Sequence, residues 1–224
     1  VTWLSRIDLA SGEVEQLTHG NRFDYNYDTR NGRTVVLTGD GATPNELYAL
    51  ADGTLKPLTK QNDALRAEVD FRPLSDFSVT REDGTRVDGL LMTPVGYKEG
   101  TKVKTFVRLH GGPVYQFSHE FLIEWQWYAA HGYAVLGVNP RGSSGRGFDY
   151  ARAIYADWGN VDSGDVLASV DEVVKMGVAD PQKLGIGGWS YGGILTDQVL
   201  VRDGRFKAAW SGAGSANAIG GQSR

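Results

Sequence analysis

Hydrophobic and polar residues follow two different patterns along the chain, and the pattern changes near residue 75. The first part alternates apolar and polar residues over short segments that end at glycine-containing turns, which is typical of β-hairpins. From residue 103 onward, short apolar runs alternate with segments that carry apolar residues at helical spacing. This second pattern predicts an α/β domain with a mostly parallel sheet and helices on both faces.

The individual elements of the second part follow from the same periodicity. Buried strands are predicted at residues 103–109, 134–138, 184–187 and 206–210. Helices are predicted at residues 120–131, 165–176 and 193–202. A hairpin around Asp83-Gly84, with strands at 77–80 and 87–92, precedes them. In such a sheet, ligands bind at the carboxyl ends of the strands.

Two segments near the beginning of the chain repeat each other. Residues 7–18 align with residues 48–59 at an offset of 41 residues, and both copies read as two short strands around a Ser-Gly or Asp-Gly turn. A period of this length with several strands per unit indicates propeller blades. An isolated β-meander is the alternative, because two copies are too few for a repeat fold to close. We therefore expect the end of a β-propeller at 1–63, a linker at 64–75 and an α/β domain at 76–224.

Composition narrows the classes of partner. The 224 residues include 23 basic and 27 acidic side chains, a net charge of −4 with no basic block, so we expect no nucleic-acid or membrane partner. The chain has no cysteine and no apolar run of the roughly 18 to 20 residues that span a bilayer. A soluble protein of cytoplasm or periplasm fits equally well. The first residue is Val1, which suggests an excerpt of a longer polypeptide whose signal peptide and oligomeric state the sequence leaves open.

Gly188-Trp189-Ser190-Tyr191-Gly192 is the strongest chemical signal. A Gly-x-Ser-x-Gly run between a strand and a helix places the serine on a sharp turn with its hydroxyl exposed, and side chains at the two glycines would collide with neighbouring backbone. The amino end of the following helix favours developing negative charge. Ser190 is thus the candidate nucleophile. The alternative is a glycine-rich turn that only caps a helix.

His110-Gly111-Gly112-Pro113 follows the strand predicted at 103–109. Acyl transfer needs backbone N–H donors for the oxyanion, one from the residue after the nucleophile and one from the loop after the third strand. Tyr191 and Gly112 fit these two positions. A simple tight turn is the alternative for the His-Gly-Gly-Pro sequence.

The loop 139–147 follows a further predicted strand and contains Arg141 and three glycines. It could cradle a substrate carbonyl or carboxylate, or serve as a flexible connector. Asp157, Asp162 and Asp165, near the start of the next helix, are predicted to be helix caps.

Several of these motifs together resemble the catalytic domain of the prolyl oligopeptidase family of serine peptidases, especially its acylaminoacyl peptidase and dipeptidyl peptidase branches. The resemblance covers about two thirds of the chain and rests on Asp83-Gly84 with Gly89-Leu90-Leu91, His110-Gly111-Gly112-Pro113, Asn139-Pro140-Arg141-Gly142-Ser143-Ser144-Gly145, Gly188-Trp189-Ser190-Tyr191-Gly192-Gly193 and Phe206-Lys207-Ala208-Ala209. It implies an α/β-hydrolase domain behind a β-propeller that screens the active site. It also implies Ser190 as nucleophile and the N–H groups of Gly112 and Tyr191 as oxyanion hole.

The chain departs from the family in its catalytic triad, whose acid and histidine the resemblance puts downstream, beyond Arg224. Asp203 is expected at the wrong edge of the sheet, and Asp197 is about 10 Å of helix away from Ser190. His110 lies at the catalytic edge but fits a loop-bracing role better than that of the base. His110 and Arg141 are candidate substrate-binding residues.

The expected function is hydrolysis of short peptides through an acyl-enzyme on Ser190, with no metal or cofactor. The 224 residues alone, lacking base and acid, are expected to show little or no turnover. An esterase and a catalytically inactive scaffold remain as alternatives. A dinucleotide-binding fold is weaker, because Gly185-Ile186-Gly187-Gly188-Trp189-Ser190 has serine in place of the third glycine of that fingerprint.

Overall fold

The computed structural model describes residues 1–215, which divide into two compact units. Unit 1 comprises Val1–Leu74 and Ser118–Gln126, and unit 2 comprises Ser75–Phe117 and the chain from Trp127 onward. Each unit is described by itself. Among the described residues, no helix has both the length and the apolar character needed to cross a membrane.

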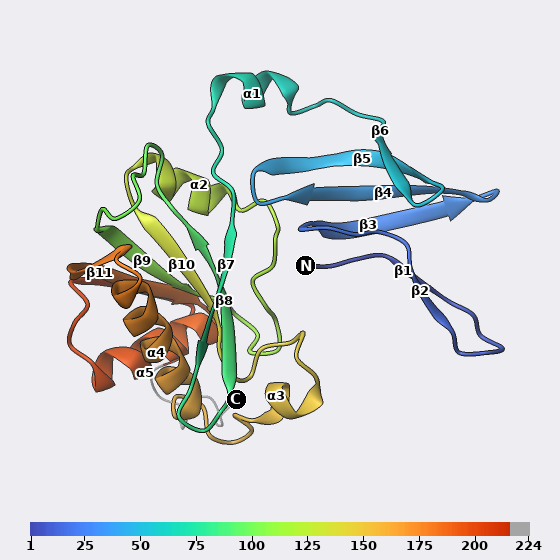
Figure 1. Ribbon diagram of the computed structural model, residues 1–224. Coiled ribbons are helices and arrows are strands. Elements are labelled where there is room, and N and C mark those ends of the chain that lie inside the picture. The colour runs from blue at the N-terminus through green and yellow to red at the C-terminus, as the bar shows by residue number, and fades with distance from the viewer. Residues whose placement is uncertain (216–224) are drawn as a thin grey trace. The chain divides into compact units, whose positions relative to one another are not determined.

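Unit 1 is built from antiparallel strands. Its elements are β1 (Ser5–Ile7), β2 (Val14–Gln16), β3 (Phe23–Arg30), β4 (Arg33–Asp40), β5 (Thr43–Ala51), β6 (Thr54–Pro57) and α1 (Asp63–Glu68). Strands β1 and β2 form a two-stranded sheet, and the other four form a sheet in the order β3-β4-β5-β6 (Figure 1).

The predicted hairpins of unit 1 are confirmed. The two copies of the sequence repeat correspond to the β1–β2 and β5–β6 pairs, and Gly12 and Gly53 in their turns have φ of +74° and +69°. The turn between β3 and β4 has positive φ at both Asn31 and Gly32, as expected for a two-residue hairpin turn. Whether these strands belong to a propeller stays a prediction.

The segment predicted as a linker contains helix α1 over Asp63–Glu68. Its residues are good helix formers, such as Ala64, Leu65 and Glu68. None of its side chains is buried. It therefore carries no apolar stripe, and periodicity could not reveal it.

Unit 2 contains a six-stranded mixed sheet with helices. Its elements are β7 (Ser75–Thr80), β8 (Arg86–Met92), β9 (Val103–Leu109), α2 (Ile123–Ala130, of which Trp127 onward belongs to this unit), β10 (Ala134–Asn139), α3 (Phe148–Arg152), α4 (Val161–Lys175), β11 (Ala179–Trp189), α5 (Tyr191–Arg202) and β12 (Ala208–Gly212). The strand order is β12-β11-β9-β10-β8-β7. The first four strands of this order run parallel, and β8 and β7 pair antiparallel (Figure 1). The prediction of a mostly parallel sheet is thus confirmed.

Helices cover both faces of this sheet. Val107 of β9 is fully buried and belongs to one apolar core with Val170 of α4 and Leu195 of α5. Its neighbour Phe106 points to the opposite face, because successive side chains of a strand alternate. There the Phe106 ring stacks on Tyr128 of α2, with 4.8 Å between the ring centroids.

The predicted boundaries differ from the observed ones mainly where apolar residues are sparse. Strand β11 begins at Ala179, five residues before the predicted start, and passes through Pro181 with a register shift between Ala179 and Leu184. Helix α4 begins at Val161, four residues before the predicted start, and its first turns bury polar side chains. Buried polar residues do not contribute to an apolar period.

Candidate active site

Ser190 occupies the turn between β11 and α5. It has φ of +58° and ψ of −122°, a conformation that non-glycine residues rarely adopt. Its N–H donates to the Gly212 carbonyl at 2.8 Å, and its carbonyl accepts from the N–H groups of Gly193 and Ile194 at 2.9 and 3.1 Å. Backbone hydrogen bonds on both sides therefore hold the strained residue in place.

The two glycines that flank this turn allow the close approach that the sequence predicted. A Cβ atom on Gly188 would lie 2.3 Å from the Gly192 carbonyl oxygen. A Cβ atom on Gly192 would lie 2.3 Å from the carbonyl oxygen of Leu109, at the end of β9. A Cβ atom does not approach a non-bonded atom this closely in proteins, so any side chain at these two positions would displace the turn from the strand ends.

The loop after β9 lies directly beside the turn. A Cβ atom on Gly111 would lie 3.2 Å from the Trp189 carbonyl oxygen and 3.5 Å from the Ser190 Cβ. Gly112, the next residue, has φ of +125° and precedes Pro113 through a cis peptide bond. The structure thus brings together the two motifs that the sequence selected. Gly111 could not be selected from the sequence alone, because it matters only where its loop approaches the turn at Ser190, which lies far away in sequence.

His110 is buried, and its two ring nitrogens are engaged within the protein. Nδ1 lies 2.7 Å from the Gly111 carbonyl oxygen, and Nε2 lies 2.9 Å from the Ser143 Oγ. Burial lowers the pKa of His110 to about 4, so the imidazole is neutral near pH 7. Because a carbonyl can only accept, Nδ1 carries the proton and Nε2 accepts from the Ser143 hydroxyl. These contacts are those of a group that braces loops.

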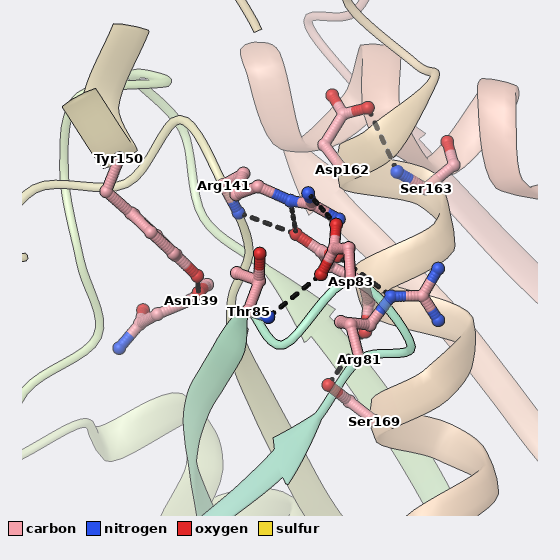
Figure 2. Close-up of polar contacts among 10 residues, drawn as sticks. Arg81, Asp83, Thr85, Asn139, Arg141, Tyr150, Asp162, Ser163 and Ser169 are labelled. Atoms are coloured by element: carbon pink, nitrogen blue, oxygen red, sulfur yellow. Dashed lines mark hydrogen bonds and ion pairs between the residues drawn. The ribbon is translucent and has the colours of Figure 1, made fainter. Parts of the chain in front are cut away.

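Arg141 forms the centre of an ion cluster that Figure 2 shows. Its Nε and Nη2 donate to the two carboxylate oxygens of Asp165 at 2.9 and 2.7 Å, and its Nη1 donates to Asp83 at 2.7 Å. The Arg141 side chain is 13% exposed and that of Asp165 is fully buried. The two carboxylates raise the pKa of Arg141 above its usual range. All three guanidinium nitrogens are therefore already bound by carboxylates.

Asp83 sits at the turn between β7 and β8. Hydrogen bonds from the Thr85 backbone and side chain, together with Arg141, lower the pKa of Asp83 to about 2. The cluster thus ties the β7–β8 turn and helix α4 to the loop after β10 (Figure 2). Direct substrate contact by Arg141 or His110 stays a prediction that their contacts do not favour.

The prediction that three aspartates cap helix α4 is wrong for Asp157 and Asp165, whereas Asp162 accepts the Ser163 N–H of the first turn at 3.0 Å. The N-cap residue is Asn160, and its side chain makes no capping bond. Asp157 accepts from the Asn160 side chain at 2.9 Å, and Asp165 binds Arg141. Local spacing suggested caps, but the partner of Asp165 lies 24 residues away in sequence.

Asp162 and Tyr191 form a contact that the sequence gave no sign of. The Tyr191 hydroxyl donates to the Asp162 Oδ2 at 2.5 Å, and both residues are buried. Burial and the nearby carboxylate raise the pKa of Tyr191 above its usual range. The Tyr191 ring also meets Trp158 edge to face, with centroids 5.1 Å apart.

Other candidate acids and bases of unit 2 are engaged elsewhere. Asp203 follows α5 and binds Arg205 at 2.8 Å, and Asp197 accepts from Ser211 at 3.1 Å. His131 precedes β10, and its Nδ1 bonds to the Trp127 carbonyl at 2.7 Å. It lies at the edge where the parallel strands begin, whereas Ser190 follows the end of β11.

Comparisons with known proteins agree with this geometry. The sequence model of the prolyl oligopeptidase family matches residues 118–224. The chain is 39% identical over 168 residues to the uncharacterized peptidase YuxL of Bacillus subtilis, which covers 74% of this chain and 26% of YuxL. It is 26% identical over 221 residues to dipeptidyl-peptidase 5 of Porphyromonas gingivalis, which covers 96% of this chain and 32% of that protein.

The fold also matches solved structures. The acylaminoacyl peptidase of Pyrococcus horikoshii superposes with a TM-score of 0.84 at 32% identity, over 91% of this chain and 33% of that one. An acylaminoacyl peptidase in complex with Z-Gly-Gly-Phe-chloromethyl ketone gives a TM-score of 0.85. The chain thus spans about a quarter to a third of the length of these relatives. By its sequence, its α/β-hydrolase-like sheet and its serine turn, the chain belongs to the prolyl oligopeptidase family.

Proposed function

We propose that this chain supplies the nucleophile and the oxyanion hole of a serine peptidase that hydrolyses short peptides. The observation that carries the proposal is the conformation of Ser190, held at φ of +58° between β11 and α5. Non-glycine residues held in such strained conformations cluster at active sites, where the surrounding structure offsets a cost of about 1 to 3 kcal/mol. The family relationship supports the same reaction.

In the proposed reaction, the Ser190 Oγ attacks the carbonyl carbon of a peptide bond. A C–O bond forms and the C–N bond breaks, while the serine proton passes through a base to the leaving amine. Water then attacks the acyl-enzyme, releases the acid product and returns the proton to Ser190. The negative charge on the carbonyl oxygen needs two donors during each attack.

Tyr191 and Gly112 are the proposed donors. Tyr191 is the first residue of α5, and the first N–H groups of a helix have no acceptor within the helix. The helix dipole adds to the attraction of the oxyanion. Gly112 adjoins Gly111, whose backbone approaches Ser190 closely. We further propose that His110 and Arg141 act by holding these loops in place, since their polar atoms are bound within the protein.

We propose that the base and acid come from outside residues 1–224. Among the described residues of unit 2, both histidines are committed elsewhere, His110 to Gly111 and Ser143 and His131 to Trp127. A serine without a base is a weak nucleophile at neutral pH. Residues 1–224 expressed alone should therefore hydrolyse peptides hardly at all, and efficient hydrolysis would contradict this assignment.

We also propose that unit 1 is the end of a β-propeller that admits only short peptides. Its support is the antiparallel sheet β3-β4-β5-β6 and the 41-residue offset between the β1–β2 and β5–β6 segments. A propeller in front of the site would exclude folded proteins by size.

A fluorophosphonate probe on the full-length protein tests the nucleophile. We expect covalent labelling of Ser190, its loss in Ser190→Ala, and normal labelling in Ser78→Ala, which changes an exposed serine of β7. Labelling that persists in Ser190→Ala would contradict the proposal. Parallel assays with ester and peptide chromogenic substrates distinguish a peptidase from an esterase, because only a peptidase cleaves the amide.

A further inference from the structure

We propose that Asp162 is a positioning residue that holds the oxyanion donor of Tyr191 in place through the phenol of that tyrosine. The inference rests on the proposed function of the Tyr191 N–H. Its structural basis is the hydrogen bond from the Tyr191 hydroxyl to the Asp162 Oδ2 at 2.5 Å. Through this bond, the start of α4 determines where the start of α5 lies.

The position of Tyr191 explains why its ring matters to the backbone. Tyr191 directly follows the strained Ser190 and opens helix α5, so its N–H belongs to the peptide plane that leaves the turn. The hydroxyl at the tip of the ring donates to Asp162, and the ring packs edge to face with Trp158. Tyr191 is 2% exposed, so its side chain is enclosed by the protein. A fixed ring therefore limits rotation of the Tyr191 backbone.

Asp162 is itself anchored in a way that suits this task. Its Oδ2 also accepts the Gly159 N–H at 3.0 Å. Its Oδ1 accepts the Ser163 N–H at 3.0 Å, as Figure 2 shows. Within residues 1–215, no lysine or arginine forms an ion pair with Asp162. A buried carboxylate without a cation depends on every hydrogen bond that it receives. The phenol is thus a costly partner to lose.

Asp165, one turn further along α4, shows the contrast. Its charge is balanced by Arg141 and by Arg81, which lies 3.2 Å away. Asp165 therefore serves an ion cluster, whereas Asp162 serves Tyr191.

The test uses four single variants of the full-length protein and the double variant of Asp162→Ala with Tyr191→Phe. Asp162→Ala removes the acceptor, and Tyr191→Phe removes only the phenol oxygen. Asp162→Asn keeps an oxygen that can accept from the phenol. Asp171→Asn is the matched control on the same helix, where the carboxylate is 64% exposed and pairs with Arg205. Active sites are counted with the fluorophosphonate probe, so that kcat refers to folded enzyme only.

We expect Asp162→Ala and Tyr191→Phe each to lower kcat by about tenfold or more, since complete loss of an oxyanion donor costs about 100- to 1000-fold. KM should change by less than about twofold, because the donor acts mainly in the transition state. The double variant should be no slower than the slower single variant, since either single change already removes the hydrogen bond between Tyr191 and Asp162. Asp162→Asn should recover part of the rate, and Asp171→Asn should match the wild type.

Unchanged kcat per active site in Tyr191→Phe would overturn the inference, and so would effects that multiply in the double variant. Tyr191→Phe keeps the test decisive if Asp162→Ala does not fold. Failure of the proposed function is recognised separately: the wild-type protein would then not label at Ser190. Labelling at Ser190 with unchanged kcat in the variants contradicts the role of Asp162 alone.

Discussion

The Nε2 atom of His110 lies 2.9 Å from the Oγ of Ser143, and both side chains are buried. The bond joins the loop after β9 to the loop after β10. In the neutral imidazole, Nδ1 donates to the Gly111 carbonyl and Nε2 accepts from the Ser143 hydroxyl. Protonation of His110 would reverse the direction of the bond to Ser143, because a hydroxyl can also accept, and it would place a charge inside the protein.

The burial of His110 makes stability depend on pH in a defined direction. The folded pKa of His110 is about 4, below the value of about 6.5 for an unfolded histidine. The unfolded state binds the proton first, so the stabilisation is present above about pH 6.5 and is lost as the pH falls toward 4. Between about pH 7 and pH 5 the loss should be about 2 kcal/mol.

Urea unfolding of wild type and His110→Gln at these two pH values measures the effect. The glutamine variant should lose about 2 kcal/mol less of its unfolding free energy over this range, since it has no imidazole to protonate. Equal losses in the two proteins would show that His110 is not the responsible group.

Gly192→Ala should destabilise unit 2 and abolish activity. The added methyl group would meet the Leu109 carbonyl oxygen at 2.3 Å, and backbone at the strand end cannot move aside cheaply. Overpacking of this kind costs about 1 to 3 kcal/mol. Thermal unfolding and probe labelling measure the two effects. Gly204→Ala is the control, because no atom lies within 4 Å of its added Cβ, and a comparable loss there would contradict the steric explanation.

Ser190→Gly should be more stable than Ser190→Ala, although both variants lack the nucleophile. Glycine adopts φ of +58° without strain, whereas alanine retains the strain of serine. After subtraction of the greater freedom of unfolded glycine, the difference should be about 1 kcal/mol. Chemical denaturation of the two variants measures it. A less stable glycine variant would mean that the turn stores no strain.

Arg141→Ala should lower the unfolding free energy by about 3 kcal/mol, because it leaves the buried Asp165 carboxylate without its two-point partner. Arg141→Lys should recover only part of this loss, since an ammonium group cannot bind two carboxylate oxygens in the same planar geometry. Lys175→Ala on the same helix is the control, with an expected change below about 0.5 kcal/mol because its ion pair is exposed. Similar losses at Arg141 and Lys175 would contradict a special role for the cluster.

The elements that periodicity revealed were those with a buried apolar face. Strand β9 and helix α5 lie where the alternation of apolar residues predicted them, and the turn at Ser190 joins a strand to a helix as its glycines indicated. Helix α1 buries no side chain, and the first turns of α4 bury Asp162, Ser163 and Asp165. Because these segments bury no apolar side chains at a helical spacing, the sequence does not reveal helix α1 or the first turn of α4.

The sequence alone determined the α/β class, the candidate nucleophile and the two motifs of the proposed oxyanion hole, because each depends on a short run of residues with a local conformational requirement. Only the tertiary structure decided the partners of His110, Arg141, Asp162 and Asp165. Hydrogen bonds and ion pairs form between atoms that the sheet brings together, and the sequence spacing of those atoms, such as 29 residues from Asp162 to Tyr191, carries no trace of the contact.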